Sequence, residues 1–332
     1  MITHIKIQNF RSFVEAEVDL QPFSLVVGAN GSGKTNLLRF FSCAINLTDL
    51  PKNFSDKPGR FVKDWQPHVS KTNEGCAFEL NHGDVLFIRG DSVNAGKDFT
   101  IRWSLRPEGA AQIFNLIASR ISRPEKIILN AVVAEDGTGT TAVLEMLKSG
   151  DRDDLFDRIE EQFRLYVPEV EKLSLKTSGE GTKQIQVREK ALPIPLPATE
   201  LSEGTRIILA ILTIIHQEKP PSMILLEDID RGLHPRLFEY LAPLLRDIAI
   251  KHDINIVATT HNPYLVDAMQ DHKEAVIIVE KKDGASTLST LASRLEGLDY
   301  DKVDPDDLPL GQLWFSGLVG GVPKSLSSRP AK

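Results

Sequence analysis

The stretch Gly28-Ala-Asn-Gly-Ser-Gly-Lys-Thr35 decides the fold, because it matches the pattern G-x-x-x-x-G-K-[ST]. It follows the apolar run 23–27, typical of a buried strand, and opens an apolar helical stripe over 34–45. Strand, glycine loop and helix in this order predict backbone N–H groups that turn inward around a phosphate at a helix N-terminus. The alternative is an ordinary glycine-rich turn with Lys34 as a solvated charge.

Two side chains at the end of this loop have expected chemical roles. Lys34 should reach the terminal phosphates of a nucleotide, and Thr35 should ligate Mg²⁺. ATP and Mg²⁺ are therefore the expected ligands. The residues expected to contact the nucleotide are Asn30, Gly31, Ser32, Gly33, Lys34 and Thr35.

An apolar strand ending in two carboxylates, Met223-Ile-Leu-Leu-Glu-Asp228, forms the second motif. Ligands of open α/β sheets bind at the carboxyl ends of strands, where acidic side chains need a cation. One of the two carboxylates, Glu227 or Asp228, can hold Mg²⁺, and the other can orient or deprotonate the attacking water. A strand that ends in a solvated acidic turn is the alternative.

A third motif, Leu201-Ser-Glu-Gly-Thr205, precedes an apolar helical pattern. Ser202 there also fits a plain helix N-cap. The motif resembles the signature of ABC-type ATPases. The whole chain, with Asn9-Phe-Arg-Ser-Phe13, Gly232-Leu-His-Pro235 and Thr260-His-Asn-Pro-Tyr264, resembles RecF/SMC-like heads, compact AAA-family ATPases of the AAA_21 and OLD-like kind without a coiled coil or toprim domain.

This resemblance implies further site residues. Ser202, Glu203 and Gly204 would face a nucleotide bound by the other protomer, so the complete site would need a homodimer. His261 would be the switch histidine that contacts the γ-phosphate or the water, although a histidine in Thr-His-Asn-Pro also suits a plain loop. Arg11 would lie near the nucleotide, and Gln66 would be a metal-binding glutamine between the lobes, unless it belongs to an exposed turn.

The order of the two carboxylates departs from the family pattern. Family members end this strand Asp-Glu or Glu-Glu, whereas the order here is Glu227-Asp228. The resemblance therefore implies Glu227 as the Mg²⁺ ligand and places Asp228, whose side chain is one methylene shorter than glutamate, at the expected position of the catalytic base. We expect slow turnover, or assistance from Asp230.

The expected fold is a P-loop α/β head with a mainly parallel sheet flanked by helices, a small antiparallel subdomain and a helical insertion. We expect a single head over 1–332, with an N-terminal lobe at about 1–105, a helical insertion at 106–167, a C-terminal lobe at 168–290 and an extension at 291–332. The extension carries Leu313, Trp314, Phe315 and Leu318 among glycines, a composition suited to docking on its own core or on a partner.

The composition narrows the class of protein. The 332 residues are 41% hydrophobic and 26% charged, and no apolar run approaches the ~20 residues that span a bilayer. Two cysteines and the absence of a leader pattern favour the cytoplasm. The net charge of −7 does not indicate a dedicated nucleic-acid binder. A local basic patch from Arg120, Arg123 and Lys126 remains open.

The leading hypothesis is an ATPase whose ATP-bound state clamps two heads together, in DNA repair or anti-phage defence with a separately encoded effector such as a nuclease. The alternatives are an ATP-binding scaffold with little turnover and the nucleotide-binding subunit of a membrane transporter. A P-loop kinase is the weakest rival, because it has no reason to carry residues 201–205.

Overall fold

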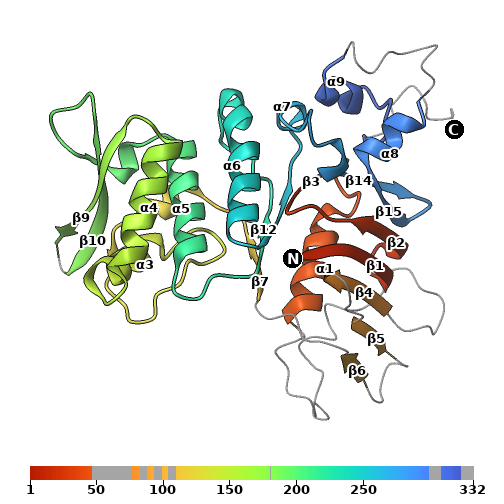
Figure 1. Cartoon of the computed structure of the whole chain (residues 1–332), viewed down its shortest axis with the longest axis horizontal. Coiled ribbons are helices and arrows are strands. Elements are labelled where there is room, and N and C mark those ends of the chain that lie inside the picture. Colours follow the sequence, from red (N-terminus) through yellow and green to blue (C-terminus); the bar gives the residue numbers. More distant parts are fainter. Residues whose placement is uncertain are drawn as a thin grey trace, which may run out of the picture. The chain divides into compact units, whose positions relative to one another are not determined.

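The chain folds into two compact units, seen in a computed structural model that describes residues 1–46, 77–82, 88–92, 99–103, 110–179, 181–298 and 308–322 (Figure 1). Unit 1 comprises Met1–Ala111, Ser222–Asp230 and Leu245–Lys332, and unit 2 comprises Gln112–Pro221 and Arg231–Leu244. Gln66 lies outside the described residues.

Unit 1 is built on a parallel sheet. Its strands run in the order β14 (Val276–Lys282), β3 (Phe23–Val27), β13 (Asn255–Thr259) and β12 (Met223–Leu226), with β15 (Ala285–Thr290) antiparallel on the outer side of β14. Every residue of β3, β12 and β13 is buried, which explains their continuous apolar sequences. The prediction of a mainly parallel α/β sheet is confirmed.

Antiparallel strands form the rest of the N-terminal part. Strand β1 (Ile2–Phe10) lies between β2 (Phe13–Asp19) and β4 (Ala77–His82), and β5 (Ile88–Ser92) pairs with β6 (Phe99–Trp103). Ile5 and Ile7 are fully buried, as the alternation of β1 predicts.

The C-terminal extension packs on its own unit, in agreement with self-docking. Helix α9 (Leu310–Phe315) contacts α7 (Pro263–Asp267), and the Gly311 N–H donates to Asp267 Oδ1 at 2.7 Å. Leu313 and Trp314 are buried, whereas Phe315 is exposed. The other helices of unit 1 are α1 (Lys34–Asn46) and α8 (Leu291–Glu296), and α6 (Phe238–Lys251) crosses the boundary between the units.

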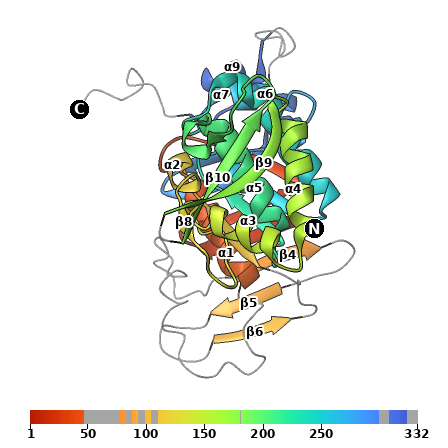
Figure 2. The ribbon, with the colours of Figure 1, turned by 90° about the vertical axis from the view of Figure 1, so that its left-hand side faces the viewer.

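Unit 2 packs helices against a small antiparallel sheet, which Figure 2 views from the side of β9 and β10. Its helices are α2 (Ala118–Ile121), α3 (Thr140–Ser149), α4 (Asp153–Tyr166) and α5 (Glu203–His216), and its sheet strands are β8 (Glu125–Lys126), β9 (Val170–Ser178), β10 (Thr182–Glu189) and β11 (Leu196–Pro197). The insertion expected to be helical, at 106–167, also contains β8 and β7 (Ala111–Phe114) among its described residues. Strands of two and four residues are too short to show a hydrophobic period.

Among the residues that the structure describes, every helix is too short or too polar to traverse a lipid bilayer.

Candidate functional site

The glycine loop joins β3 to α1 in unit 1, as the motif predicts. A Cβ at Gly28 would meet the backbone carbonyl of Val279, and a Cβ at Gly33 would meet the hydroxyl of Ser286. Gly33 also has a φ of 122°, which L side chains rarely adopt. Both glycines are therefore required by close approach of the neighbouring strands.

Hydrogen bonds of Ser12, Asn36 and Ser286, which we call the brace, hold the glycine loop in place. The sequence did not predict these contacts. The hydroxyl of Ser286 donates to the Ser32 carbonyl at 2.5 Å and lies 2.8 Å from the hydroxyl of Ser12. Asn36 Nδ2 donates to the same Ser12 oxygen at 2.9 Å. Ser12 and Ser286 are both buried, so these bonds fix the loop against β15 and the turn after β1.

Lys34 is buried and directed into the loop. Its Nζ donates to the carbonyls of Gly28 at 2.8 Å and Ala29 at 3.1 Å. Burial lowers the pKa of Lys34 to about 8, although nearby carboxylates, Asp228 first among them, favour the charged form. The ammonium is thus held where additional negative charge would stabilise it.

The loop fits a bound phosphate. Among the described residues, the buried Ser32 Oγ has no hydrogen-bond partner, and a buried hydroxyl without a partner is costly. It lies in a glycine loop that opens α1, whose first N–H groups are donors for an anion. The donors present therefore suit a nucleotide polyphosphate.

Thr35 and Glu227 meet across the sheet edge. The Thr35 hydroxyl donates to Glu227 Oε1 at 2.6 Å, which brings together two residues 192 positions apart. A hydroxyl and a carboxylate are oxygen ligands of the kind that Mg²⁺ prefers. The structure thus places the two expected metal ligands next to each other.

Asp228 follows Glu227 with a left-handed backbone. Its φ is 48°, and its N–H donates to Thr259 Oγ1 at 2.9 Å. Asp and Asn adopt this conformation more readily than longer side chains do. This backbone offers a physical reason for the order Glu227-Asp228, because the second carboxylate occupies a position where an aspartate costs less than a glutamate.

His261 lies beside Asp228, with Nε2 3.9 Å from Oδ1. Burial, and then the charge of Lys34, lower the pKa of His261, while Asp228 and Asp230 oppose the shift. The imidazole is therefore mainly neutral at pH 7. Asp230 Oδ1 accepts from the hydroxyl of Thr260 at 2.6 Å and from the His261 N–H at 3.4 Å, so it positions the loop that carries the histidine.

Arg11 occupies the turn between β1 and β2 with a φ of 50°, and its guanidinium lies 5.8 Å from the centre of the Phe10 ring. The residue that follows it, Ser12, makes the contacts of the brace. The proximity of Arg11 to a nucleotide stays a prediction.

The signature motif lies in unit 2, at the start of α5. Ser202 caps this helix, since its Oγ accepts from the Thr205 N–H at 3.1 Å. Ser202 and Glu203 are exposed, whereas Gly204 is buried and a Cβ there would meet the side chain of Leu237. The N-cap interpretation is thus confirmed, and the exposed cap leaves a helix N-terminus open to an anion.

The depressed pKa of Lys34 predicts proton uptake on nucleotide binding. Phosphates beside the ammonium favour its charged form and raise the pKa of Lys34 above 8. When ADP binds with Mg²⁺, the protein should therefore take up about half a proton at pH 8 and almost none at pH 6.5. Calorimetry in buffers of different ionisation enthalpy measures this number. Lys34→Arg, which stays charged, should abolish the uptake; equal heats in all buffers for the wild type would contradict the prediction.

Comparisons with known proteins agree with the fold. The AAA_21 family model, described as "AAA domain, putative AbiEii toxin, Type IV TA system", matches residues 23–267. No curated protein sequence matches the chain at a significant level. The solved structures that match include an SMC head bound to the C-winged helix domain of ScpA, with a TM-score of 0.55 and 16% identity, covering 87% of this chain and 97% of that one.

Two further SMC heads give similar alignments. The head domain from Thermotoga maritima matches with a TM-score of 0.52 and 15% identity, covering 87% of this chain and 98% of that one. The Pyrococcus furiosus head with an extended coiled coil, bound to the C-terminal domain of ScpA, matches with a TM-score of 0.52 and 14% identity, covering 91% and 99%. At these identities, the likeness shows a common P-loop fold.

Proposed function

Because the chain belongs to the AAA domain family whose model matches residues 23–267, we propose that it hydrolyses ATP and acts as a nucleotide-gated dimeric switch. One observation carries the ATPase part of the proposal: the 2.6 Å hydrogen bond between Thr35 and Glu227. It joins the phosphate loop to the acidic strand end, beside the pair formed by Asp228 and His261.

Each residue of the site has its own role in the proposed reaction. The loop and Lys34 bind and orient the phosphates, and Thr35 and Glu227 hold Mg²⁺, which when bound neutralises charge on the phosphate oxygens. Asp228 accepts the proton of the attacking water or orients that water, and the neutral His261 donates a hydrogen bond beside it. The Asp230 carboxylate keeps His261 in place through the backbone of its loop.

The dimer part of the proposal rests on the exposed start of α5. Ser202, Glu203 and the first N–H groups of this helix would complete the site of a second protomer by contacting its γ-phosphate. Hydrolysis would then separate the two heads. The proposal includes a separately encoded effector and a role in DNA repair or anti-phage defence. The family description names a putative toxin of a toxin–antitoxin system, and two of the matching SMC heads were solved with a ScpA domain bound.

A scaffold that binds ATP with little turnover is the second candidate. The short carboxylate of Asp228 at the expected base position favours it. Phosphate release separates the two functions.

Purified protein should release phosphate from ATP in the presence of Mg²⁺, and the release should stop when the metal is chelated. A chelator can remove the ion because Thr35 and Glu227 supply only part of its hexacoordinate shell. A colorimetric phosphate assay with ATP in excess measures the rate. ATP binding without phosphate release, with Mg²⁺ present, would instead establish the scaffold.

A further inference from the structure

One face of the β9–β10 hairpin in unit 2 is polar and basic. Residues paired across an antiparallel ladder share a face, and alternate residues face opposite ways. The pairs Leu173 with Val187 and Leu175 with Ile185 therefore define the inner face, which α3 and α4 contact. The outer face consists of Lys172, Ser174, Lys176, Ser178, Thr182, Gln184, Gln186 and Arg188.

Strand β8 extends this outer face. Lys126 pairs with Thr182 and so lies on the outer side, whereas Glu125 pairs with Lys183 on the inner side. The Glu125 carboxylate accepts from the N–H groups of Gly139 and Ala142 at the start of α3. We call Lys126, Lys172, Lys176 and Arg188 the cationic face; all four are exposed.

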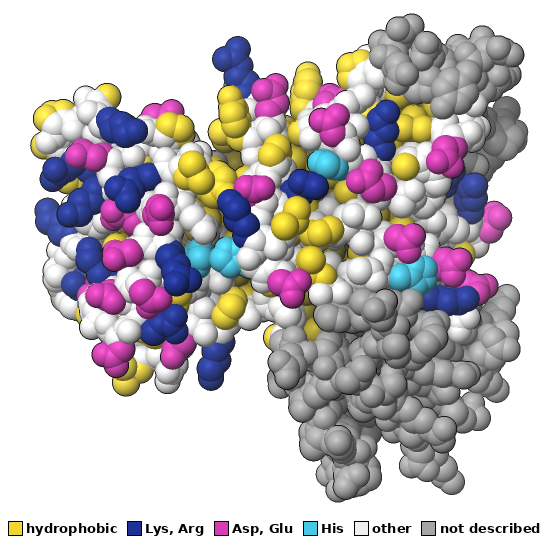
Figure 3. All heavy atoms as spheres, viewed as in Figure 1, with side chains coloured by type: hydrophobic (Ala, Val, Ile, Leu, Met, Phe, Trp, Pro, Cys, Tyr) yellow, Lys and Arg dark blue, Asp and Glu magenta, His cyan; other side chains and the backbone are white. Residues whose placement is uncertain are grey.

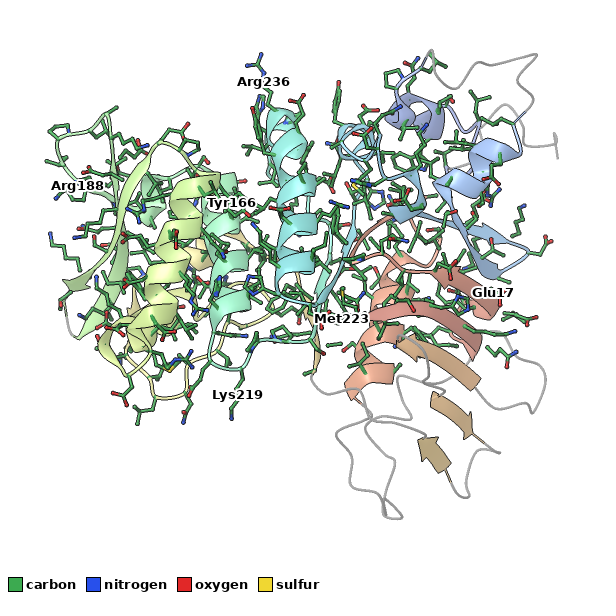
Figure 4. All side chains as sticks on the ribbon, viewed as in Figure 1. Glu17, Tyr166, Arg188, Lys219, Met223 and Arg236 are labelled. Carbon is green, nitrogen blue, oxygen red and sulfur yellow. The ribbon has the colours of Figure 1, made fainter. Side chains whose placement is uncertain are left out.

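Acidic residues are missing from these outer positions in the described part of the hairpin. Of the carboxylates on its strands, Glu189 pairs with the buried Val170, and Glu171 occupies the β-bulge at one end. Such a face is unexpected on a chain with a net charge of −7. In Figure 3, lysine and arginine side chains lie along the margin of unit 2 near the hairpin, with acidic side chains among them, and Figure 4 shows Arg188 at this margin.

Two of these cations oppose each other directly. Lys172 and Arg188 are partners in the ladder, and like charges at such positions destabilise a sheet. Neither makes an ion pair in the part of the chain that the structure describes. A bound polyanion would convert this repulsion into attraction.

We propose that the cationic face binds the phosphate backbone of a nucleic-acid duplex. Ser, Thr, Gln, Lys and Arg side chains are the usual donors to phosphate oxygens. Lys172 and Lys176 are four residues apart, about 13 Å along the strand, which matches the axial rise of about four nucleotides of one strand. The outer positions of the hairpin carry no aromatic residue on which unpaired bases would stack, so the face favours a duplex over single strands. Binding to the phosphate backbone should show no sequence preference.

The position of this face differs from the basic patch expected from the sequence. Of the three residues of that patch, Lys126 belongs to the cationic face. Arg120 lies 3.6 Å from the carboxylate of Asp136, which offsets its charge. The new assignment depends on the register of the ladder and not on the ATPase activity.

Binding of labelled duplex DNA, measured by fluorescence anisotropy over a range of salt concentrations, tests the proposal. Four neutralised phosphates give a slope of log K against log salt of about −3.6. Lys172→Glu should reduce the steepness of that slope by about 1 and weaken binding at least about tenfold. It should not unfold the hairpin, because it turns the opposed pair with Arg188 into an attractive one.

Lys281→Glu is the matched control, because Lys281 is an exposed lysine on β14 of unit 1. It should bind duplex DNA as the wild type does. Thermal melting should show that Lys172→Glu is at least as stable as the wild type. No duplex binding by the wild type, equal losses in both variants, tighter binding to single strands, or binding to anionic lipid vesicles in place of the duplex would each overturn the proposal.

Discussion

Asp228→Asn is expected to lower the rate of phosphate release by about 10²- to 10⁴-fold while ATP still binds, because the amide cannot accept the proton of the attacking water. Asn suits the left-handed backbone at this position, where φ is 48°, so the fold should be preserved. Ala would add backbone strain to the loss of the carboxylate. Phosphate release and binding of a fluorescent ATP analogue, measured on the same preparation, separate the two effects.

Asp283→Asn provides the matched control. Asp283 also has a left-handed backbone, with a φ of 50°, and it is exposed in the turn between β14 and β15. The same chemical change there should leave the rate unaltered. Wild-type rates in Asp228→Asn would show that another group acts as the base, and Asp230 would be the first to test.

Ser202→Arg is expected to abolish ATP-dependent dimers and to reduce phosphate release to the level of an isolated protomer, while ATP binding is retained. The exposed cap of α5 would carry a long side chain at the place proposed for the partner's γ-phosphate. Loss of the cap itself costs only about 1 kcal/mol of stability. Light scattering and phosphate release, with ATP binding as the reference, measure the effect.

Ser149→Arg is the control for the added charge. Ser149 is exposed at the C-terminal end of α3 in the same unit, where an arginine suits the helix dipole. This variant should dimerise and hydrolyse ATP as the wild type does. Full activity of Ser202→Arg would exclude the start of α5 from the site.

The sequence was sufficient for those parts of the site that local patterns encode. The glycine loop between strand and helix, the apolar strand before Glu227 and the N-cap at Ser202 each follow from a few consecutive residues. Their roles in catalysis stay predictions.

The brace behind the loop had no local signal. Ser286 lies 254 residues from Ser32 and 274 from Ser12, and isolated serines in a strand or a turn carry no pattern that links them. The left-handed backbone of Asp228 was likewise hidden, because it results from the turn that Thr259 and the neighbouring strand impose. Tertiary contacts of this kind form only in the packed sheet, so they cannot be predicted from short stretches of sequence.

The cationic face could be predicted from the sequence only in part. Lys172 and Lys176 alternate with apolar residues, and this alternation is visible in the sequence. That Arg188 lies opposite Lys172 depends on the register, which a β-bulge shifts near the end of the hairpin.

The most direct test of a nucleotide-gated dimer is the mass of Asp228→Asn in solution, measured by light scattering without nucleotide, with Mg-ADP and with Mg-ATP. Because this variant should hold ATP without hydrolysing it, the account predicts a doubled mass with ATP alone and a protomer in the other two conditions. A mass that is the same in all three conditions would contradict gating by the nucleotide.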